Sequence, residues 1–173
     1  MTEAVITLAD GREMAFELFP GPAPITVASF AQAANAGFYD GLAFCRVVKG
    51  YVIQGGSPDN DIMTDSHFHI RGEFAQNGVD TGLTHLRGAI SMARDEGPDT
   101  AGTQFFIAHQ DARKLDGRYA AFGGMTRGFD VLDAIADVPT TGPDTWHKPL
   151  DMPVMRSVRV TTDEALPPVQ RLP

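Results

Sequence analysis

The segment FCRVVKGYVIQGG, residues 44–56, predicts a β-hairpin. Its two apolar halves are short enough to be strands, and Gly50 between them can adopt the left-handed backbone conformation that tight hairpin loops use. Strict alternation along the first strand would place Phe44 and Arg46 on one face and Cys45 on the other. A guanidinium among apolar neighbours needs a polar partner, because a half-buried charge without one is costly.

The length of the hairpin loop decides which residue faces Arg46. A two-residue loop at 49–50 would place Ile53 opposite it, whereas a three-residue loop at 49–51 would place Gln54 there. We favour the three-residue loop, because the side-chain oxygen of Gln54 can accept a hydrogen bond from the guanidinium. In the alternative interpretation, Arg46 points to solvent and only its aliphatic stem packs on the protein. The local pattern favours neither interpretation over the other.

The rest of the chain is typical of short strands with two well-separated helices. One helix should begin at Pro24 and end before Gly37, and the second should span 128–137. The many strands favour an all-β barrel whose open ends the helices cover. Further strands are predicted at 3–8, 14–19, 87–93, 103–109, 119–125 and 153–160, with one short strand at 68–70 inside a long polar loop, 57–85.

Composition limits the classes of function. The chain has 173 residues, 43% of them hydrophobic and 21% charged, which is usual for a soluble globular protein of one domain. A net charge of −8 argues against binding nucleic acid. No apolar run approaches the roughly 18 residues that predict a membrane span, so no membrane partner is expected.

The ends of the chain and its single cysteine indicate the compartment. The first residues, MTEAVITLAD, lack the basic and apolar regions of a secretory signal. Cys45 is the only cysteine, which excludes an intrachain disulfide. We therefore expect a cytoplasmic protein with one domain at residues 1–162. The Pro-rich residues 163–173 should form a C-terminal tail.

Four segments together resemble the cyclophilin-type peptidyl-prolyl isomerases. They are the hairpin segment, GAISMARDEGPDTAGTQFFIAH at 88–109, LDGRYAAFGGMTRGFDVLDAI at 115–135 and KPLDMPV at 148–154. The resemblance runs in order over residues 3–160, and IRGEFAQNG at 70–78 is similar to the bacterial branch. It implies a mainly β fold, an eight-stranded antiparallel closed barrel capped by two α-helices. The active site would lie on the barrel's outer surface.

The same resemblance implies roles for individual residues. The family's catalytic arginine falls on Arg46 and its companion glutamine on Gln54. Four positions depart from the usual pattern: Cys45 replaces a histidine, Tyr51 replaces a phenylalanine, Tyr119 replaces a histidine, and Lys114 stands where some members carry a tryptophan that binds cyclosporin. The implied substrate-binding positions are Tyr51, Met92, Phe106 and Leu115 in a proline pocket, Arg94 and Gln104 along the substrate backbone, and Tyr119 at the rim.

These residue types suit rotation about an X-Pro bond. Amide resonance sets a barrier of about 18–20 kcal/mol, and a fixed cation at the prolyl nitrogen would stabilise the twisted amide more than either planar form. No bond is made or broken, so neither a cofactor nor a metal is required. The expected partners are proline-containing peptides and unfolded or folding proteins, with weak binding of cyclosporin-type inhibitors. The protein is expected to be a monomer.

Two other functions remain open. His67, His69 and Glu73 in HFHIRGE spell half of the metal motif of cupins, which are also β-barrels. The other half of that motif is missing. Alternatively, the protein could keep the fold and bind proline peptides with little catalysis, for which the only grounds are Cys45 and Tyr51.

Overall fold

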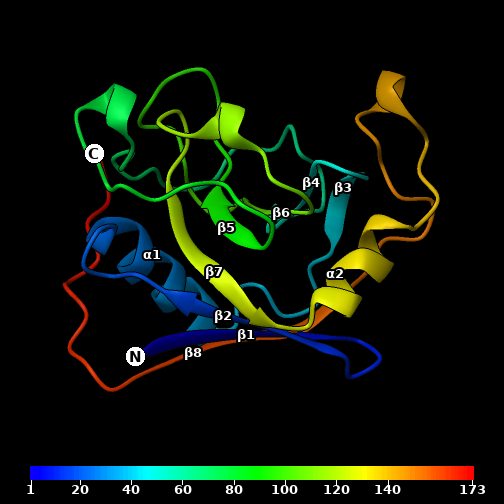
Figure 1. Ribbon diagram of the computed structural model, residues 1–173, viewed down its shortest axis with the longest axis horizontal. Helices are drawn as coiled ribbons and strands as arrows, with labels where there is room; N and C mark the ends of the chain where they lie inside the picture. Colours follow the sequence, from blue (N-terminus) through cyan, green and yellow to red (C-terminus); the bar gives the residue numbers. More distant parts are fainter.

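The computed structural model describes residues 1–173 as one antiparallel sheet of eight strands with two α-helices (Figure 1). The predicted strands are all present except the one at 68–70, where only Ile70 pairs, in an isolated bridge with Ala101. The polar residues around Ile70 do not extend the pairing. The strands are β1 (Thr2–Leu8), β2 (Glu13–Leu18), β3 (Phe44–Val48), β4 (Val52–Gly55), β5 (Ala89–Met92), β6 (Phe105–Ala108), β7 (Ala121–Arg127) and β8 (Met155–Thr162).

The sheet curls around a single core. Its strand order is β3-β4-β6-β5-β7-β2-β1-β8, and every neighbouring pair is antiparallel. The two outermost strands are β3 and β8, and the residues just before them, Ala43 and Val154, form an isolated bridge beside a hydrogen bond of 2.9 Å from the Phe44 N–H to the Pro153 carbonyl. The predicted eight-stranded barrel with two helices is confirmed, and this short contact is what closes it.

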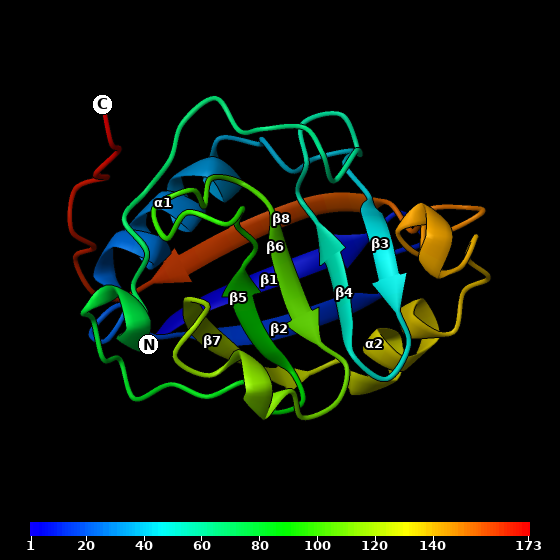
Figure 2. The same ribbon diagram turned by 90° about the horizontal axis from the view of Figure 1, so that it is seen from above.

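The helices cover opposite ends of the barrel, as both views show (Figures 1 and 2). Helix α1 (Pro24–Asn35) buries Val27 and Phe30 in the core, and helix α2 (Phe129–Ala136) buries Leu132. Phe30 contacts the rings of Tyr39, Phe105 and Phe122 at centroid distances of 5.1–5.6 Å. None of the helices has the length and apolar character needed to cross a membrane.

Helix α1 begins without a capping side chain of its own. Ala23 precedes it and offers no side-chain acceptor. The buried carboxylate of Glu73 takes that place, accepting 2.7 Å hydrogen bonds from the Thr26 N–H and hydroxyl and a 3.3 Å bond from the Ile25 N–H. A carboxylate suits this position, because the first N–H groups of a helix lack partners within the helix and carry partial positive charge.

The Pro-rich tail packs on the rest of the molecule. Leu172 donates its N–H to the His69 carbonyl at 2.9 Å, and the Arg171 guanidinium lies 3.9 Å from the centroid of the Phe68 ring. Arg171 also donates to the Gln32 side chain on α1 at 3.1 Å. The tail therefore holds part of the long loop against the first helix.

Candidate active site

The hairpin of β3 and β4 has the predicted three-residue loop. Val48 pairs with Val52, and Arg46 pairs with Gln54. Gly50 takes a left-handed conformation with φ +82°, which allows the tight connection. The Arg46 Nη1 donates to the Gln54 Oε1 at 3.2 Å. Both the register and the partner proposed for the guanidinium are confirmed.

A β-bulge corrects the prediction that Phe44 and Arg46 share a face. The register shifts between these residues, so that Cys45 is an extra residue in β3. Phe44 and Val47 both belong to the hydrophobic core, whereas Arg46 is only partly buried. Strict alternation cannot place Phe44 in the core and Arg46 outside it, because it would turn both side chains to the same face. The bulge is therefore what directs the guanidinium away from the core.

A line of hydrogen-bonded side chains runs away from Arg46. Gln54 accepts from Arg46 with its oxygen and donates its Nε2 to the Gln104 Oε1 at 2.9 Å. Gln104, just before β6, donates in turn to the carbonyls of Ile62 and Thr64, each at 3.2 Å. Each amide is held at both ends, so the orientation of Gln54 toward Arg46 is set by the sheet and by the 57–64 loop together.

A cavity of about 500 Å³ opens beside this line. Its apolar part contains Tyr51, Phe106, Leu115 and Tyr119, and the Phe106 and Tyr119 rings meet edge to face at 5.7 Å. This volume lies in the range that binds small ligands. The lining residues are Arg46, Tyr51, Val52, Gln54, Ile62, Met63, Ala93, Arg94, Asp95, Glu96, Phe106, Leu115, Tyr119 and Trp146.

Met92 does not belong to this cavity, contrary to the prediction. It is 2% exposed and lies in the main core, paired with the core residue Phe105 across β5 and β6. Val52 and Ala93 line the cavity instead. Val52 could have been found from the sequence, because it lies two residues before Gln54 and therefore on the same face of β4.

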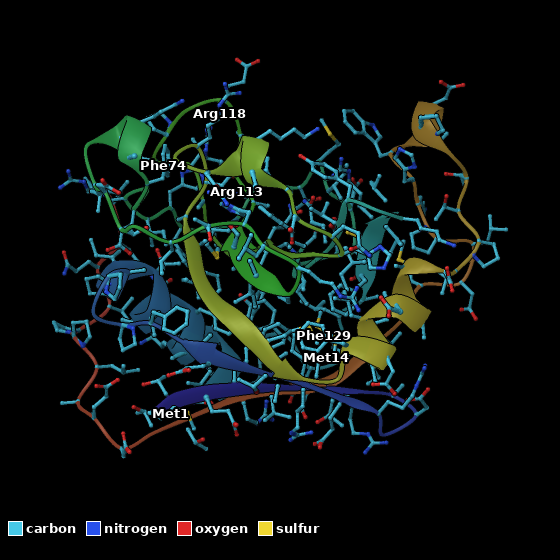
Figure 3. The ribbon with its side chains drawn as sticks, in the orientation of Figure 1. Met1, Met14, Phe74, Arg113, Arg118 and Phe129 are labelled. Atoms are coloured by element: carbon cyan, nitrogen blue, oxygen red, sulfur yellow. The ribbon has the colours of Figure 1, made fainter.

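Arg94 lines the cavity, but its guanidinium is already occupied. It donates to the carbonyls of Asp95, Glu96 and Arg118 at 2.7–3.1 Å. It also stacks on the Phe74 ring, 4.9 Å from the centroid. Figure 3 labels Phe74 and Arg118, which lie on the same upper side of the molecule in that view. The side chain therefore braces two loop segments, and the predicted contact with substrate backbone would need other atoms of this residue.

A buried histidine supports the wall of the cavity. The His85 ring stacks on Phe106, with centroids 5.8 Å apart and planes 16° from parallel. Its Nε2 lies 2.8 Å from the Ser91 Oγ, and its Nδ1 lies 3.0 Å from an Asp116 carboxylate oxygen. Burial lowers the pKa of His85, although the hydrogen bond to Asp116 opposes that shift. Ser91 is fully buried, so this arrangement cannot present a nucleophile to a substrate.

Folding stability should decrease as the pH falls below about 6.5, the usual pKa of an unfolded histidine. Because the pKa of His85 is lowered in the folded state, the unfolded chain gains the proton first. The stabilisation is complete above that pH and is lost toward the folded-state pKa. Urea unfolding at pH 7.5 and 5.0 measures the loss in the free energy of unfolding, with His85→Gln as the control. Equal pH dependence in both proteins would contradict the prediction.

The pKa values of Cys45 and Tyr51, the two departures in the hairpin, are both raised, which favours the neutral form of each side chain. Burial raises the pKa of the Cys45 thiol to about 11. The pKa of Tyr51 is also raised, mainly by burial. Burial thus favours the protonated thiol of Cys45, and the residue does not line the cavity.

The alternative metal site at His67, His69 and Glu73 is not formed. The Glu73 carboxylate accepts hydrogen bonds from the first residues of helix α1, and the His69 Nε2 lies 2.8 Å from the Asp65 Oδ1. No group of three or more His, Cys, Asp or Glu side chains is arranged to hold a metal ion. Glu73 in HFHIRGE therefore serves a helix contact, and His69 makes a local hydrogen bond to Asp65.

Comparisons with known proteins agree with one another. Residues 4–160 match the family model described as cyclophilin type peptidyl-prolyl cis-trans isomerase/CLD. Peptidyl-prolyl cis-trans isomerase B of Bacillus subtilis is 43% identical over 130 residues, covering 75% of this chain and 87% of that protein. A peptidyl-prolyl cis-trans isomerase of Helicobacter pylori is 43% identical over 124 residues, covering 70% and 73%.

A solved structure extends the likeness to the fold. The cyclophilin type peptidyl-prolyl cis-trans isomerase of Cryptosporidium parvum, crystallised in the presence of the dipeptide Ala-Pro, superposes with a TM-score of 0.82. Its sequence is 27% identical, and the match covers 93% of this chain and 99% of that one.

Proposed function

The chain belongs to the cyclophilin-type peptidyl-prolyl cis-trans isomerases, and we propose that Arg46 is the residue that accelerates rotation about X-Pro bonds. The observation that carries this assignment is the hydrogen-bonded line from Arg46 through Gln54 to Gln104, beside an apolar cavity. It holds a permanent cation next to a site that can take a proline ring.

The reaction follows from the electronic change in the amide. Rotation breaks amide resonance, and the lone pair returns to the prolyl nitrogen, which becomes a better hydrogen-bond acceptor in the twisted state. The Arg46 guanidinium donates there and stabilises that state more than either planar isomer. The rings of Tyr51 and Phe106 and the side chain of Leu115 hold the proline ring in place while the other side of the bond rotates. These apolar groups also exclude water and strengthen the interaction.

Gln54 and Gln104 act as positioning residues in this proposal. Each has its amide oxygen and nitrogen engaged, so neither can rotate without breaking a hydrogen bond. Arg46 forms no salt bridge with a carboxylate, and its one side-chain hydrogen-bond partner is the neutral Gln54. The charge is therefore available to the substrate.

The proposed substrates are proline-containing peptides and unfolded or folding proteins. The related Cryptosporidium parvum structure was determined in the presence of Ala-Pro, a dipeptide that contains proline. We further propose a cytoplasmic monomer. Cyclosporin-type inhibitors should bind weakly, because Lys114 occupies the position of the family's tryptophan and lies over the Tyr51 ring, 4.5 Å from its centroid.

An isomerisation assay on a tetrapeptide that contains Ala-Pro tests the proposed activity directly. Tyr51 keeps an aromatic ring in the cavity, and Cys45 lies outside it, so neither departure removes a catalytic group. We expect a clear acceleration over the uncatalysed rate. Binding of the peptide without acceleration would instead support a proline-binding module.

The isomerisation rate should be nearly constant from pH 6 to 8 and insensitive to EDTA. Arginine side chains stay charged throughout this range, the glutamines do not ionise, and burial raises the pKa of Tyr51 further above it. The rate is measured at several pH values after subtraction of the uncatalysed reaction. A bell-shaped profile, or loss of activity on chelation, would contradict the proposed chemistry.

A further inference from the structure

Two large apolar side chains of the cavity are exposed to solvent. Met63 is 71% exposed and Trp146 is 57% exposed, and both line the same cavity as Arg46. They come from different loops, Met63 from the segment after β4 and Trp146 from the segment between α2 and β8. Exposed apolar surface that gathers at one site commonly marks a binding surface.

The loop that carries Trp146 is tied to the catalytic strand. The Val47 N–H, next to Arg46, donates to the His147 carbonyl at 3.0 Å. Within the loop, the His147 N–H donates to the Gly142 carbonyl at 2.9 Å. Trp146 itself has a left-handed conformation with φ +61°, which is uncommon for a bulky residue. The backbone thus holds the indole beside the cavity, where it stays partly exposed.

Trp146 lies on the other side of Arg46 from the proposed proline pocket. Phe106 belongs to β6 and Leu115 to the short helix η2 (Arg113–Leu115), whereas the Trp146 loop lies beside β3. Both ribbon views show η2 and this loop on opposite sides of β3 and β4 (Figures 1 and 2). A peptide whose proline fills the pocket would therefore have its flanking residues within reach of the exposed indole.

We propose that Trp146 and Met63 form a second subsite, which binds a large apolar side chain of the substrate outside the X-Pro dipeptide. The inference rests on the proposed function, because it places the proline at Tyr51, Phe106 and Leu115. The subsite makes the enzyme selective among X-Pro sequences. Burial of an apolar side chain against the indole and the thioether supplies the selectivity.

Pairs of peptides test the subsite. Each pair has one Ala-Pro bond and differs only in Phe or Ala at one flanking position, scanned on both sides of the proline. Exchange NMR avoids a coupling protease that would itself select for Phe. In at least one position, we expect the wild-type enzyme to favour Phe by about fivefold to tenfold in kcat/KM, in the range of a partly exposed apolar contact. Trp146→Ala and Met63→Ala should reduce this ratio toward one.

Leu150→Ala is the matched control. Leu150 belongs to the same loop and is 71% exposed, but it does not line the cavity, so its removal should leave the Phe/Ala ratio unchanged. A wild-type ratio near one at every position, or a ratio that Trp146→Ala does not change, would overturn the subsite. Failure of the wild-type enzyme to accelerate even the Ala peptides would instead overturn the proposed function.

Fluorescence gives an independent readout, because Trp146 is the only tryptophan in the chain. Titration with the preferred Phe peptide should shift the emission of the wild-type protein to shorter wavelength, and the corresponding Ala peptide should shift it less. Equal shifts with both peptides would contradict the proposal. An emission that changes with protein concentration and not with peptide would show that the patch is a contact between two copies of the chain.

Discussion

Replacing Arg46 with alanine should leave the protein folded and reduce the isomerisation rate by roughly 10²–10³-fold, the usual effect of removing one donor that stabilises a transition state. The cavity has no cation to replace it, because the guanidinium of Arg94 is engaged by three backbone carbonyls. The fold should persist, since Arg46 lies outside the core and its only side-chain hydrogen bond goes to Gln54.

The peptide assay and circular dichroism, carried out on the same sample, measure activity and folding together. Arg46→Lys should recover only part of the rate, because it restores a charge without the rigid planar donor. Arg12→Ala is a control for loss of positive charge, since Arg12 pairs with Asp10 at the distant β1–β2 turn. Activity of Arg46→Ala within a factor of a few of the wild type would reject Arg46 as the catalytic residue.

Replacing Glu73 with alanine should lower the free energy of unfolding by about 3 kcal/mol. Hydrogen bonds to a charged group contribute about 1.5–3 kcal/mol each and are not additive, and Glu73 accepts three of them at the start of α1. The side chain is 3% exposed, so water cannot readily replace it. For a chain of this size the loss corresponds to a decrease in Tm of roughly 6–12 °C.

Chemical and thermal unfolding measure this effect, and two variants control it. Glu73→Gln keeps one oxygen acceptor for Thr26 and should lose less stability than the alanine variant. Glu96→Ala removes an exposed carboxylate that makes no side-chain hydrogen bond and should change stability by less than about 0.5 kcal/mol. If Glu73→Ala is as stable as Glu96→Ala, the carboxylate does not hold the helix.

Much of the fold was predictable because local signals agree with the tertiary structure. Pro24 and Gly37 lie at the two ends of α1, and the need of Arg46 for a partner favoured the correct hairpin register. The strand at 68–70 was predicted wrongly, because an apolar residue at each end of a histidine imitates alternation. Only the structure shows that Ile70 alone finds a partner strand.

The candidate site was less predictable, for three physical reasons. A bulge has no reliable signature in sequence, so the separation of Phe44 from Arg46 could not be read from alternation. The family resemblance placed Met92 in the pocket, but the direction of a side chain on β5 depends on its pairing with β6. Trp146 reaches the cavity from a loop far along the chain, and no periodicity in the sequence predicts such a contact.

The pairing of β1 with β8 has a consequence for synthesis of the protein. Thr2 and Thr162 are paired neighbours, so one edge of β1 finds its partner only at the far end of the chain. While the chain emerges from the ribosome, β1 can pair with β2 but presents its other edge unpaired until the last strand is made. Contacts of such long range slow folding, and an open edge can recruit another nascent chain. The barrel can therefore be completed only after β8 has been made.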